Sequence, residues 1–91
     1  MGIIQFNLLI SGQVQGVGYR ISARNVAEGL NLTGWVRNIA DGGVEIMAEG
    51  DIEPLEQLVA WAKNGPTYAQ VYDVEIKQLS ATGEFTGFFI R

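Results

Sequence analysis

Nine residues near the start of the chain combine three glycines with a final arginine, and this combination can bind a phosphate group. The segment reads Gly12-Gln13-Val14-Gln15-Gly16-Val17-Gly18-Tyr19-Arg20. Glycines allow backbone N–H groups to turn inward and approach a ligand closely. An arginine at the start of a helix adds a planar fork of donors to the helix N-terminus. Loop, helix N-terminus and guanidinium together predict an anion site.

Other uses of such a loop fit the residues less well. A Walker A motif needs Lys-Ser or Lys-Thr after the glycines, and neither pair follows here. A dinucleotide fingerprint needs a third glycine where Ile21 stands. By itself the segment could also be an ordinary connection from a strand to a helix. Ser11 has no His or nearby Lys to activate it as a nucleophile, so we interpret it as loop structure.

The composition restricts the chemistry that this site can perform. The 91 residues contain no His and no Cys, which removes the usual neutral-pH base, the commonest metal ligands and a thiolate nucleophile. Five carboxylates gather in the middle of the chain, at Glu45, Glu49, Asp51, Glu53 and Glu56. They alternate along a strand and occupy a helix start, which is typical of a solvated face. We therefore expect no metal and no cofactor.

Length and charge indicate one small acidic domain spanning residues 1–91. A hydrophobic share of 47% with two prolines suits a folded globule. The formal net charge is −4, whereas a nucleic-acid binder normally has a basic footprint. No apolar stretch approaches the roughly 20 residues of a membrane helix, and the start does not resemble a signal peptide. We expect a cytoplasmic protein with neither nucleic acid nor membrane as a partner.

The elements that must position the loop follow from periodicity. Apolar residues alternate in the predicted strands and recur every three or four positions in the predicted helices. The predicted strands cover residues 3–10, 32–40, 44–49, 70–79 and 85–90, and the predicted helices cover residues 19–30 and 52–62. Asn31 is predicted as a left-handed cap and Asp51 as an N-cap. Asp41-Gly42 favours a tight primed turn between the second and third strands.

The order β-α-β-β-α-β, with a terminal strand added, predicts a ferredoxin-like α+β sandwich. Each helix has one apolar stripe, so both are expected on the same face of an antiparallel sheet. The first strand, the first helix and the second strand form a crossover unit, and their two strands run the same way. Both strands therefore end at one edge of the sheet. Asn38, near the end of the second strand, is expected to meet the segment that ends at Arg20.

The whole pattern resembles that of the acylphosphatases. The glycine segment carries the resemblance together with Gly34-Trp35-Val36-Arg37-Asn38, Asp41-Gly42, Val44-Glu45, Gly65-Pro66, Ala69 and Val71. It covers essentially the whole chain and implies a ferredoxin-like fold. The implied reaction is hydrolysis of an acyl phosphate to a carboxylate and inorganic phosphate. Two departures are mild: Tyr19 stands where phenylalanine is common, and Gln13 stands where a basic residue is frequent.

The resemblance also implies roles for individual residues. Arg20 corresponds to the phosphate-binding arginine and Asn38 to the asparagine that orients water. Backbone N–H groups of Gln15, Gly16, Val17, Gly18, Tyr19 and Arg20 would share the phosphate oxygens. The chemistry suits a chain without His or Cys, because a carboxylate with a pKa of about 4 leaves without being protonated. The implied partner is a small-molecule acyl phosphate, with inorganic phosphate as product or competitor. We expect the enzyme to be a monomer.

Two other functional classes remain open at this stage. One is a catalytically silent regulatory or binding module, since a fold does not determine a function. The other is an RNA-binding domain, which would carry aromatic residues on its sheet and a basic balance. The predicted third strand has no aromatic residue. A related domain also begins larger carbamoyl-transfer proteins of hydrogenase maturation, but we expect a stand-alone enzyme. Arg37 is interpreted as a surface residue that could attract anions.

Overall fold

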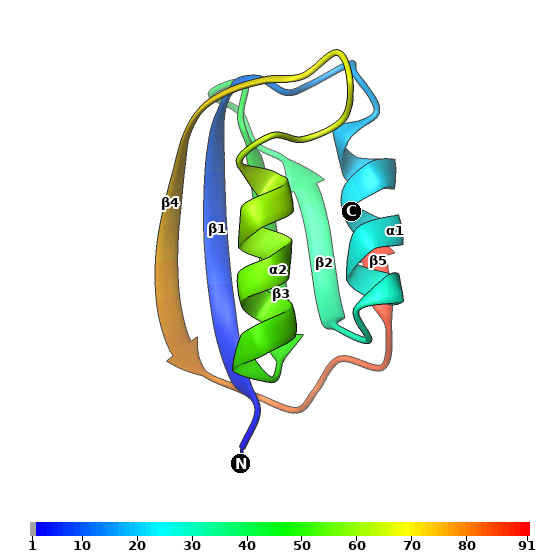
Figure 1. Ribbon diagram of the computed structural model, residues 1–91, viewed down its shortest axis with the longest axis vertical. Helices are drawn as coiled ribbons and strands as arrows, with labels where there is room; N and C mark the ends of the chain where they lie inside the picture. The colour runs from blue at the N-terminus through cyan, green and yellow to red at the C-terminus, as the bar shows by residue number, and fades with distance from the viewer. Residues whose placement is uncertain (1) are drawn as a thin grey trace.

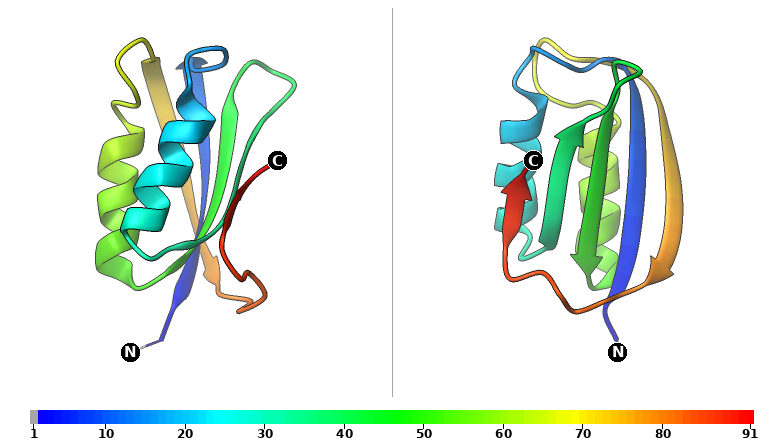
Figure 2. Two further views of the ribbon diagram at one scale, coloured as in Figure 1. Left: turned by 90° about the vertical axis from the view of Figure 1, so that its right-hand side faces the viewer. Right: turned by 180° about the vertical axis from the view of Figure 1, so that it is seen from behind.

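Two helices cover one face of a five-stranded sheet, and the other face carries no helix (Figures 1 and 2). The computed structural model describes residues 2–91. The elements are β1 (Ile4–Gln13), α1 (Tyr19–Gly29), β2 (Thr33–Asn38), β3 (Val44–Gly50), α2 (Ile52–Ala62), β4 (Gln70–Ser80) and β5 (Phe88–Ile90). The predicted ferredoxin-like order is confirmed. Two strand ends differ from the prediction by three residues: β1 runs three residues further, and β5 begins three residues later.

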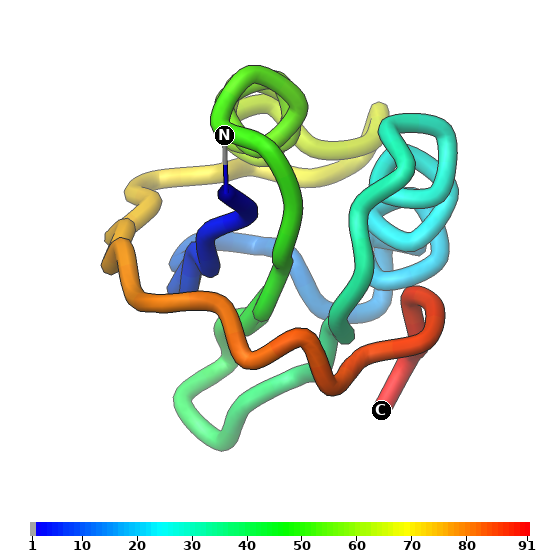
Figure 3. Tube along the Cα trace, turned by 90° about the horizontal axis from the view of Figure 1, so that it is seen from below, coloured from blue at the N-terminus to red at the C-terminus, as the bar shows by residue number. Residues whose placement is uncertain are grey.

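The sheet has the order β4-β1-β3-β2-β5, and every neighbouring pair is antiparallel except β2 and β5. The four main strands are antiparallel to one another where they pair, as predicted, and the added terminal strand pairs in parallel. After β4 the chain crosses beneath the sheet to the far side of β2 (Figure 3). From there β5 starts at the same end as β2 and pairs with it in parallel. This crossing brings the C-terminal residues beside β2 and α1.

The core lies between the sheet and the two helices. Along β1, the alternating residues Phe6, Leu8 and Ile10 are all buried, as the period of two predicts. Ala23 and Ala27 of α1 are fully buried, and such small side chains allow a helix to lie close to a sheet. The predicted left-handed cap at Asn31 is confirmed by its φ of 58°. No helix within residues 2–91 is long and apolar enough to cross a membrane.

Polar residues are also buried on the face of the sheet that carries no helix. Glu49 is 2% exposed and accepts hydrogen bonds from Gln5, from both the N–H and the hydroxyl of Thr82, and from the N–H of Gly83. Burial alone raises the pKa of Glu49, but these hydrogen bonds outweigh it and the pKa is lowered. Glu49 thus pins the segment between β4 and β5 to the sheet.

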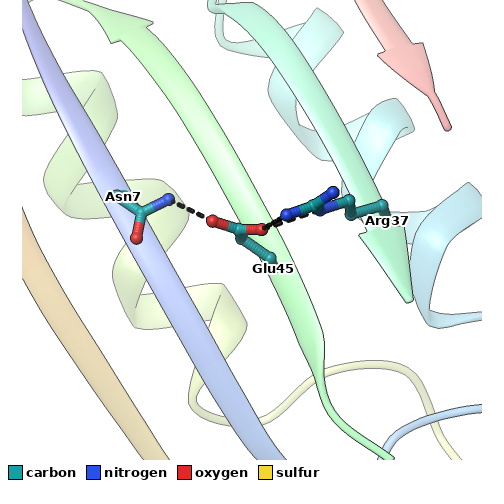
Figure 4. A network of polar contacts seen from close by, with 3 residues as sticks. All are labelled: Asn7, Arg37 and Glu45. Atoms are coloured by element: carbon teal, nitrogen blue, oxygen red, sulfur yellow. Dashed lines mark hydrogen bonds and ion pairs between the residues drawn. The ribbon is translucent and has the colours of Figure 1, made fainter. Parts of the chain in front are cut away.

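Glu45 is the second carboxylate that does not fit the predicted solvated face. It accepts a hydrogen bond from Asn7 at 2.8 Å and forms an ion pair with Arg37 at 2.7 Å (Figure 4). Its side chain is only 14% exposed. The expectation of a solvated carboxylate face is therefore wrong for Glu45 and Glu49, because neighbouring strands bring donors that the sequence spacing does not reveal.

Candidate active site

The loop that joins β1 to α1 is shorter than the nine-residue motif. Gly12 and Gln13 belong to β1, while Tyr19 and Arg20 form the first turn of α1. Gly18 occupies the N-cap of α1 in the left-handed conformation, and no side chain caps this helix end. The backbone N–H groups of the first turn therefore point outward without a side-chain acceptor. A helix end of this kind is a ready anion site.

Glycine is required at the three positions of the motif for different structural reasons. Gly16 and Gly18 have φ angles of 77° and 78°, which favour glycine, and a Cβ at either position would have nothing within 4 Å. The loop surface is thus open to a ligand. Gly12, by contrast, faces β4 at a register shift, and a Cβ there would lie 2.1 Å from the carbonyl oxygen of Gln70. Gly12 permits strand pairing, so the expectation that it helps to cradle a ligand is not supported by its position.

Gln15 ties this loop to the hairpin between β2 and β3. Its Nε2 donates to the carbonyl oxygen of Ile39 at 2.8 Å and to that of Gly43 at 2.9 Å. Asn38 immediately precedes Ile39, so the bridge locates Asn38 relative to the loop. The resemblance to the acylphosphatases implies only a backbone role for Gln15. A long amide side chain in a glycine loop was the one available signal for this bridge.

The hairpin that carries Asn38 differs from the predicted primed turn. A primed turn of the Asp-Gly type needs positive φ at both residues, but Gly42 has a φ of 94° and Asp41 is not in that region. The N–H of Gly42 donates to Ile39, and the N–H of Ile39 donates to Gly43. The carboxylate of Asp41 accepts from the N–H of Gly43 at 2.8 Å, which stabilises the turn locally.

Arg20 and Asn38 line the same pocket, as the crossover topology predicts. The pocket has a volume of about 360 Å³. Its lining residues are Val14, Gly16, Gly18, Tyr19, Arg20, Ile21, Asn38 and Ile90. The loop brings open backbone, α1 brings the guanidinium, and β2 brings an amide side chain that can hydrogen-bond water. Of the predicted phosphate-binding residues, Gln15 and Val17 flank this lining without belonging to it.

The charge of Arg20 is not neutralised by a carboxylate side chain. Within residues 2–91 the one ion pair joins Arg37 to Glu45. Arg20 Nη1 instead makes a long contact of 3.5 Å to the main-chain oxygen of Arg91. Arg91 is held there because its N–H donates to Val36 of β2 at 2.9 Å. A cation without a carboxylate side chain as its partner, next to an open helix N-terminus, attracts an anionic ligand.

Tyr19 can serve the site only through its backbone. Its side chain is 1% exposed and its hydroxyl donates to the carbonyl oxygen of Ala62 at 2.9 Å. Its ring lies 5.1 Å from that of Trp61, and burial raises the pKa of the Tyr19 hydroxyl well above its ordinary value. The tyrosine that departs from the family pattern is thus accommodated inside the core. Trp61 packs against the same core.

Arg37 does not face the pocket. Its guanidinium carbon lies 5.2 Å from the ring centre of Trp35, and its ion pair with Glu45 offsets its charge. Arg91 lies over the same ring at 4.7 Å. Trp35 is 8% exposed and is therefore buried beneath these two guanidinium groups. The interpretation of Arg37 as a surface residue is confirmed too, while its ion pair makes it a weak attractor of anions.

A larger hollow of about 720 Å³ lies by the N-terminus of α2, at the opposite end of the molecule from the glycine loop. Asp51 and Glu53 line it, and these carboxylates disfavour a phosphate. The Asp51 N-cap is confirmed by its position and extended backbone, although its side chain makes no capping hydrogen bond. In residues 2–91 no three His, Cys, Asp or Glu side chains gather into a group that could hold a metal.

Comparison with known proteins identifies the family. The family model described as acylphosphatase matches residues 6–90. The chain belongs to the acylphosphatase family. It is 51% identical over 88 residues to an acylphosphatase of Marinobacter nauticus, covering 97% of this chain and 96% of that protein. The crystal structure of acylphosphatase from Bacillus subtilis superposes with a TM-score of 0.93 at 35% identity, covering 97% of this chain and 98% of that one.

One similar structure belongs to a much larger protein. Full-length HypF, in its phosphate- and nucleotide-bound form, matches with a TM-score of 0.90 at 29% identity. The match covers 98% of this chain but 12% of HypF. The Marinobacter and Bacillus proteins are instead matched over nearly their full length.

Proposed function

We propose that this chain hydrolyses the carboxyl-phosphate bond of acyl phosphates, with Arg20 binding the phosphate and Asn38 orienting the attacking water. The observation that carries these roles is that α1 and β2 bring Arg20 and Asn38 to one pocket beside the open N-terminus of α1. Membership of the acylphosphatase family supports the reaction. The backbone N–H groups from Gln15 to Arg20 would share the charge of the phosphate oxygens.

The reaction balances without a cofactor. The oxygen of water attacks phosphorus, the bond between phosphorus and the acyl oxygen breaks, and its electron pair leaves with the carboxylate. The proton of the water passes to a phosphate oxygen of the substrate. The amide of Asn38 accepts a hydrogen bond from the water through its carbonyl oxygen and does not itself take the proton. The products are a carboxylate and inorganic phosphate.

The leaving group explains why this residue set suffices. A carboxylate with a pKa of about 4 departs without a general acid. Phosphoryl transfer passes through a loose transition state, so that catalysis consists largely of positioning and electrostatic stabilisation. Arg20 and the backbone donors of the loop supply the stabilisation, and Asn38 supplies the positioning. The same set would serve a phosphate monoester poorly, because its alkoxide leaving group needs a proton.

The experiment is steady-state hydrolysis of acetyl phosphate by the wild type and by Arg20→Ala and Asn38→Ala. Loss of one oriented contact typically costs about 10²–10³ in rate, and we expect at least that for each variant. Arg24→Ala, one turn further along α1, and Asn64→Ala, two residues beyond α2, are the matched controls and should retain activity. Near-normal turnover by a folded Asn38→Ala protein would refute its role.

The proposal extends to the setting of the enzyme. It acts as a monomer in the cytoplasm on a small-molecule substrate, with inorganic phosphate as product and competitor. The acidic net charge of −4 supports the absence of a nucleic-acid partner. Trp35 supports it too, because two arginines cover its ring and leave no platform for stacking bases. Sedimentation velocity, cell fractionation and a mobility-shift assay with RNA test these points separately.

A further inference from the structure

Two isoleucines of the catalytic pocket have no role in binding the phosphate. Ile21 directly follows Arg20 in the first turn of α1, and Ile90 is the last residue of β5. Both line the pocket together with Arg20 and Asn38. Ile21 is 55% exposed and does not belong to the core. Ile90 is half-buried and contributes accessible surface to the same pocket.

Ile21 and Ile90 are the lining residues that remain available to contact the acyl group. The loop glycines, Arg20 and Asn38 are committed to the phosphate and the water in the proposed function. Val14 and Tyr19 are each only 1% exposed and so offer almost no surface. The accessible apolar surface of the pocket is therefore the acyl wall, by which we mean Ile21 and Ile90.

We propose that the acyl wall makes this enzyme selective for acyl phosphates with an uncharged, apolar acyl group. This inference rests on the proposed function and names the substrate class for the same site. An apolar chain that packs on Ile21 removes surface of both partners from water, which is favourable. A second anionic group on the acyl chain would instead lose its hydration against isoleucine, without a free cation to bind it.

The neighbouring arginine does not supply that cation. Arg91 follows Ile90, but its guanidinium lies over the ring of Trp35 and it is not among the residues that line the pocket. Trp35 pairs with Phe89 across β2 and β5, whereas Ile90 pairs with the fully buried Val36. Because side chains alternate along a strand, Ile90 and Arg91 point to opposite faces of the sheet. The pocket thus has one cation, Arg20, which the phosphate already occupies.

The test is a homologous series of acetyl, propionyl, butyryl and pentanoyl phosphate. These substrates carry leaving groups of nearly equal basicity, so differences in kcat/KM report contacts of the chain. Full burial of a methylene is worth about fourfold in affinity. We expect kcat/KM to rise by about twofold for each methylene up to butyryl phosphate, since the wall covers the chain from one side only.

The variants locate the selectivity. Ile21→Ser should flatten the series and lower kcat/KM for butyryl phosphate by about tenfold, while changing acetyl phosphate by about twofold or less. Its inhibition constant for inorganic phosphate should stay unchanged, because the phosphate contacts are untouched. Ile52→Ser is the matched control: Ile52 opens α2 as an isoleucine of 44% exposure at the opposite end of the molecule. Ile90→Ala tests the second half of the wall.

The outcomes separate this inference from the function on which it rests. A wild-type series with equal kcat/KM throughout, or a slope that survives in both Ile21→Ser and Ile90→Ala, would overturn the acyl wall. In either case Arg20→Ala still abolishes hydrolysis of acetyl phosphate if the proposed function is right. If the wild type hydrolyses acetyl phosphate no faster than the uncatalysed background, the proposed function itself fails, whereas equal activity of the wild type and Arg20→Ala would refute the role of Arg20.

Discussion

The bridge made by Gln15 gives the sharpest prediction about how the site is held together. Its amide donates two hydrogen bonds, at 2.8 and 2.9 Å, to the hairpin that carries Asn38. Gln15→Ala removes both donors and leaves the loop free to move relative to the hairpin. Each neutral hydrogen bond contributes about 0.5–1.5 kcal/mol net. Because Gln15 is exposed, the lower half of that range applies and we expect about 1–2 kcal/mol of destabilisation.

The effect on activity should exceed the effect on stability. A displacement of a catalytic group by about 1 Å can cost about 10²-fold in rate. The backbone pairing of β2 with β3 still holds Asn38, so we expect Gln15→Ala to lower kcat/KM by about tenfold. Gln13→Ala is the matched control, since Gln13 is an exposed glutamine two residues away whose side chain makes no hydrogen bond in the described part of the chain. It should behave as the wild type in both assays.

A double-mutant cycle shows whether Gln15 acts through Asn38. Residues that share one function are non-additive, so Gln15→Ala should cost little once Asn38 is already alanine. Urea unfolding of the same four proteins would show the 1–2 kcal/mol stability loss in both backgrounds. If Gln15→Ala lowers kcat/KM by the same factor with and without Asn38, the positioning argument is wrong. It is equally wrong if stability falls and kcat/KM does not change.

Three further outcomes follow from particular contacts. The pKa of Glu49 is lowered in the folded state, so the ionised carboxylate stabilises the fold above its ordinary pKa of 4.5, and this stabilisation is lost as pH falls through the lower folded value. Urea unfolding from pH 7 to pH 3 should therefore show a smaller fall in the free energy of unfolding for Glu49→Gln than for the wild type. Gly12→Ala should destabilise the protein by at least about 2 kcal/mol more than Gly83→Ala. Both glycines have positive φ, but only at Gly12 would a Cβ lie against a backbone carbonyl. Thermal unfolding of the two variants measures the difference in their stability. Tyr19→Phe leaves the buried carbonyl of Ala62 without its donor, so it should lower the free energy of unfolding by about 1–3 kcal/mol while kcat for acetyl phosphate is preserved. A fall in kcat would mean that the hydroxyl serves the site.

The sequence alone determined the elements and the two residues of the site. Periods of two and of three to four residues predicted the strands and helices, because each element must bury one face. The crossover of β1, α1 and β2 then implied that Arg20 and Asn38 meet at one edge, and they line one pocket. These conclusions need only local pattern and chain direction. Their roles in catalysis stay a prediction until the variants are assayed.

Contacts between residues distant in sequence were decided only by the tertiary structure. Gln15 reaches carbonyl groups 24 and 28 residues away, and Glu49 binds the segment at Thr82 and Gly83. Neither contact leaves a trace in local spacing, since it depends on strand register and on the path of a loop. The parallel pairing of β5 arises in the same way from the crossing beneath the sheet.

Gly12 and Ile21 show the same division within the motif itself. The sequence placed Gly12 with the two ligand-facing glycines, but packing of β1 against β4 is what requires it. In the sequence, Ile21 served only to exclude a dinucleotide fingerprint, yet in the fold it lines the same pocket as Ile90. A residue's type and spacing predict the chemistry of which it is capable. Which surface it faces is decided by long-range packing, which depends on the whole chain at once.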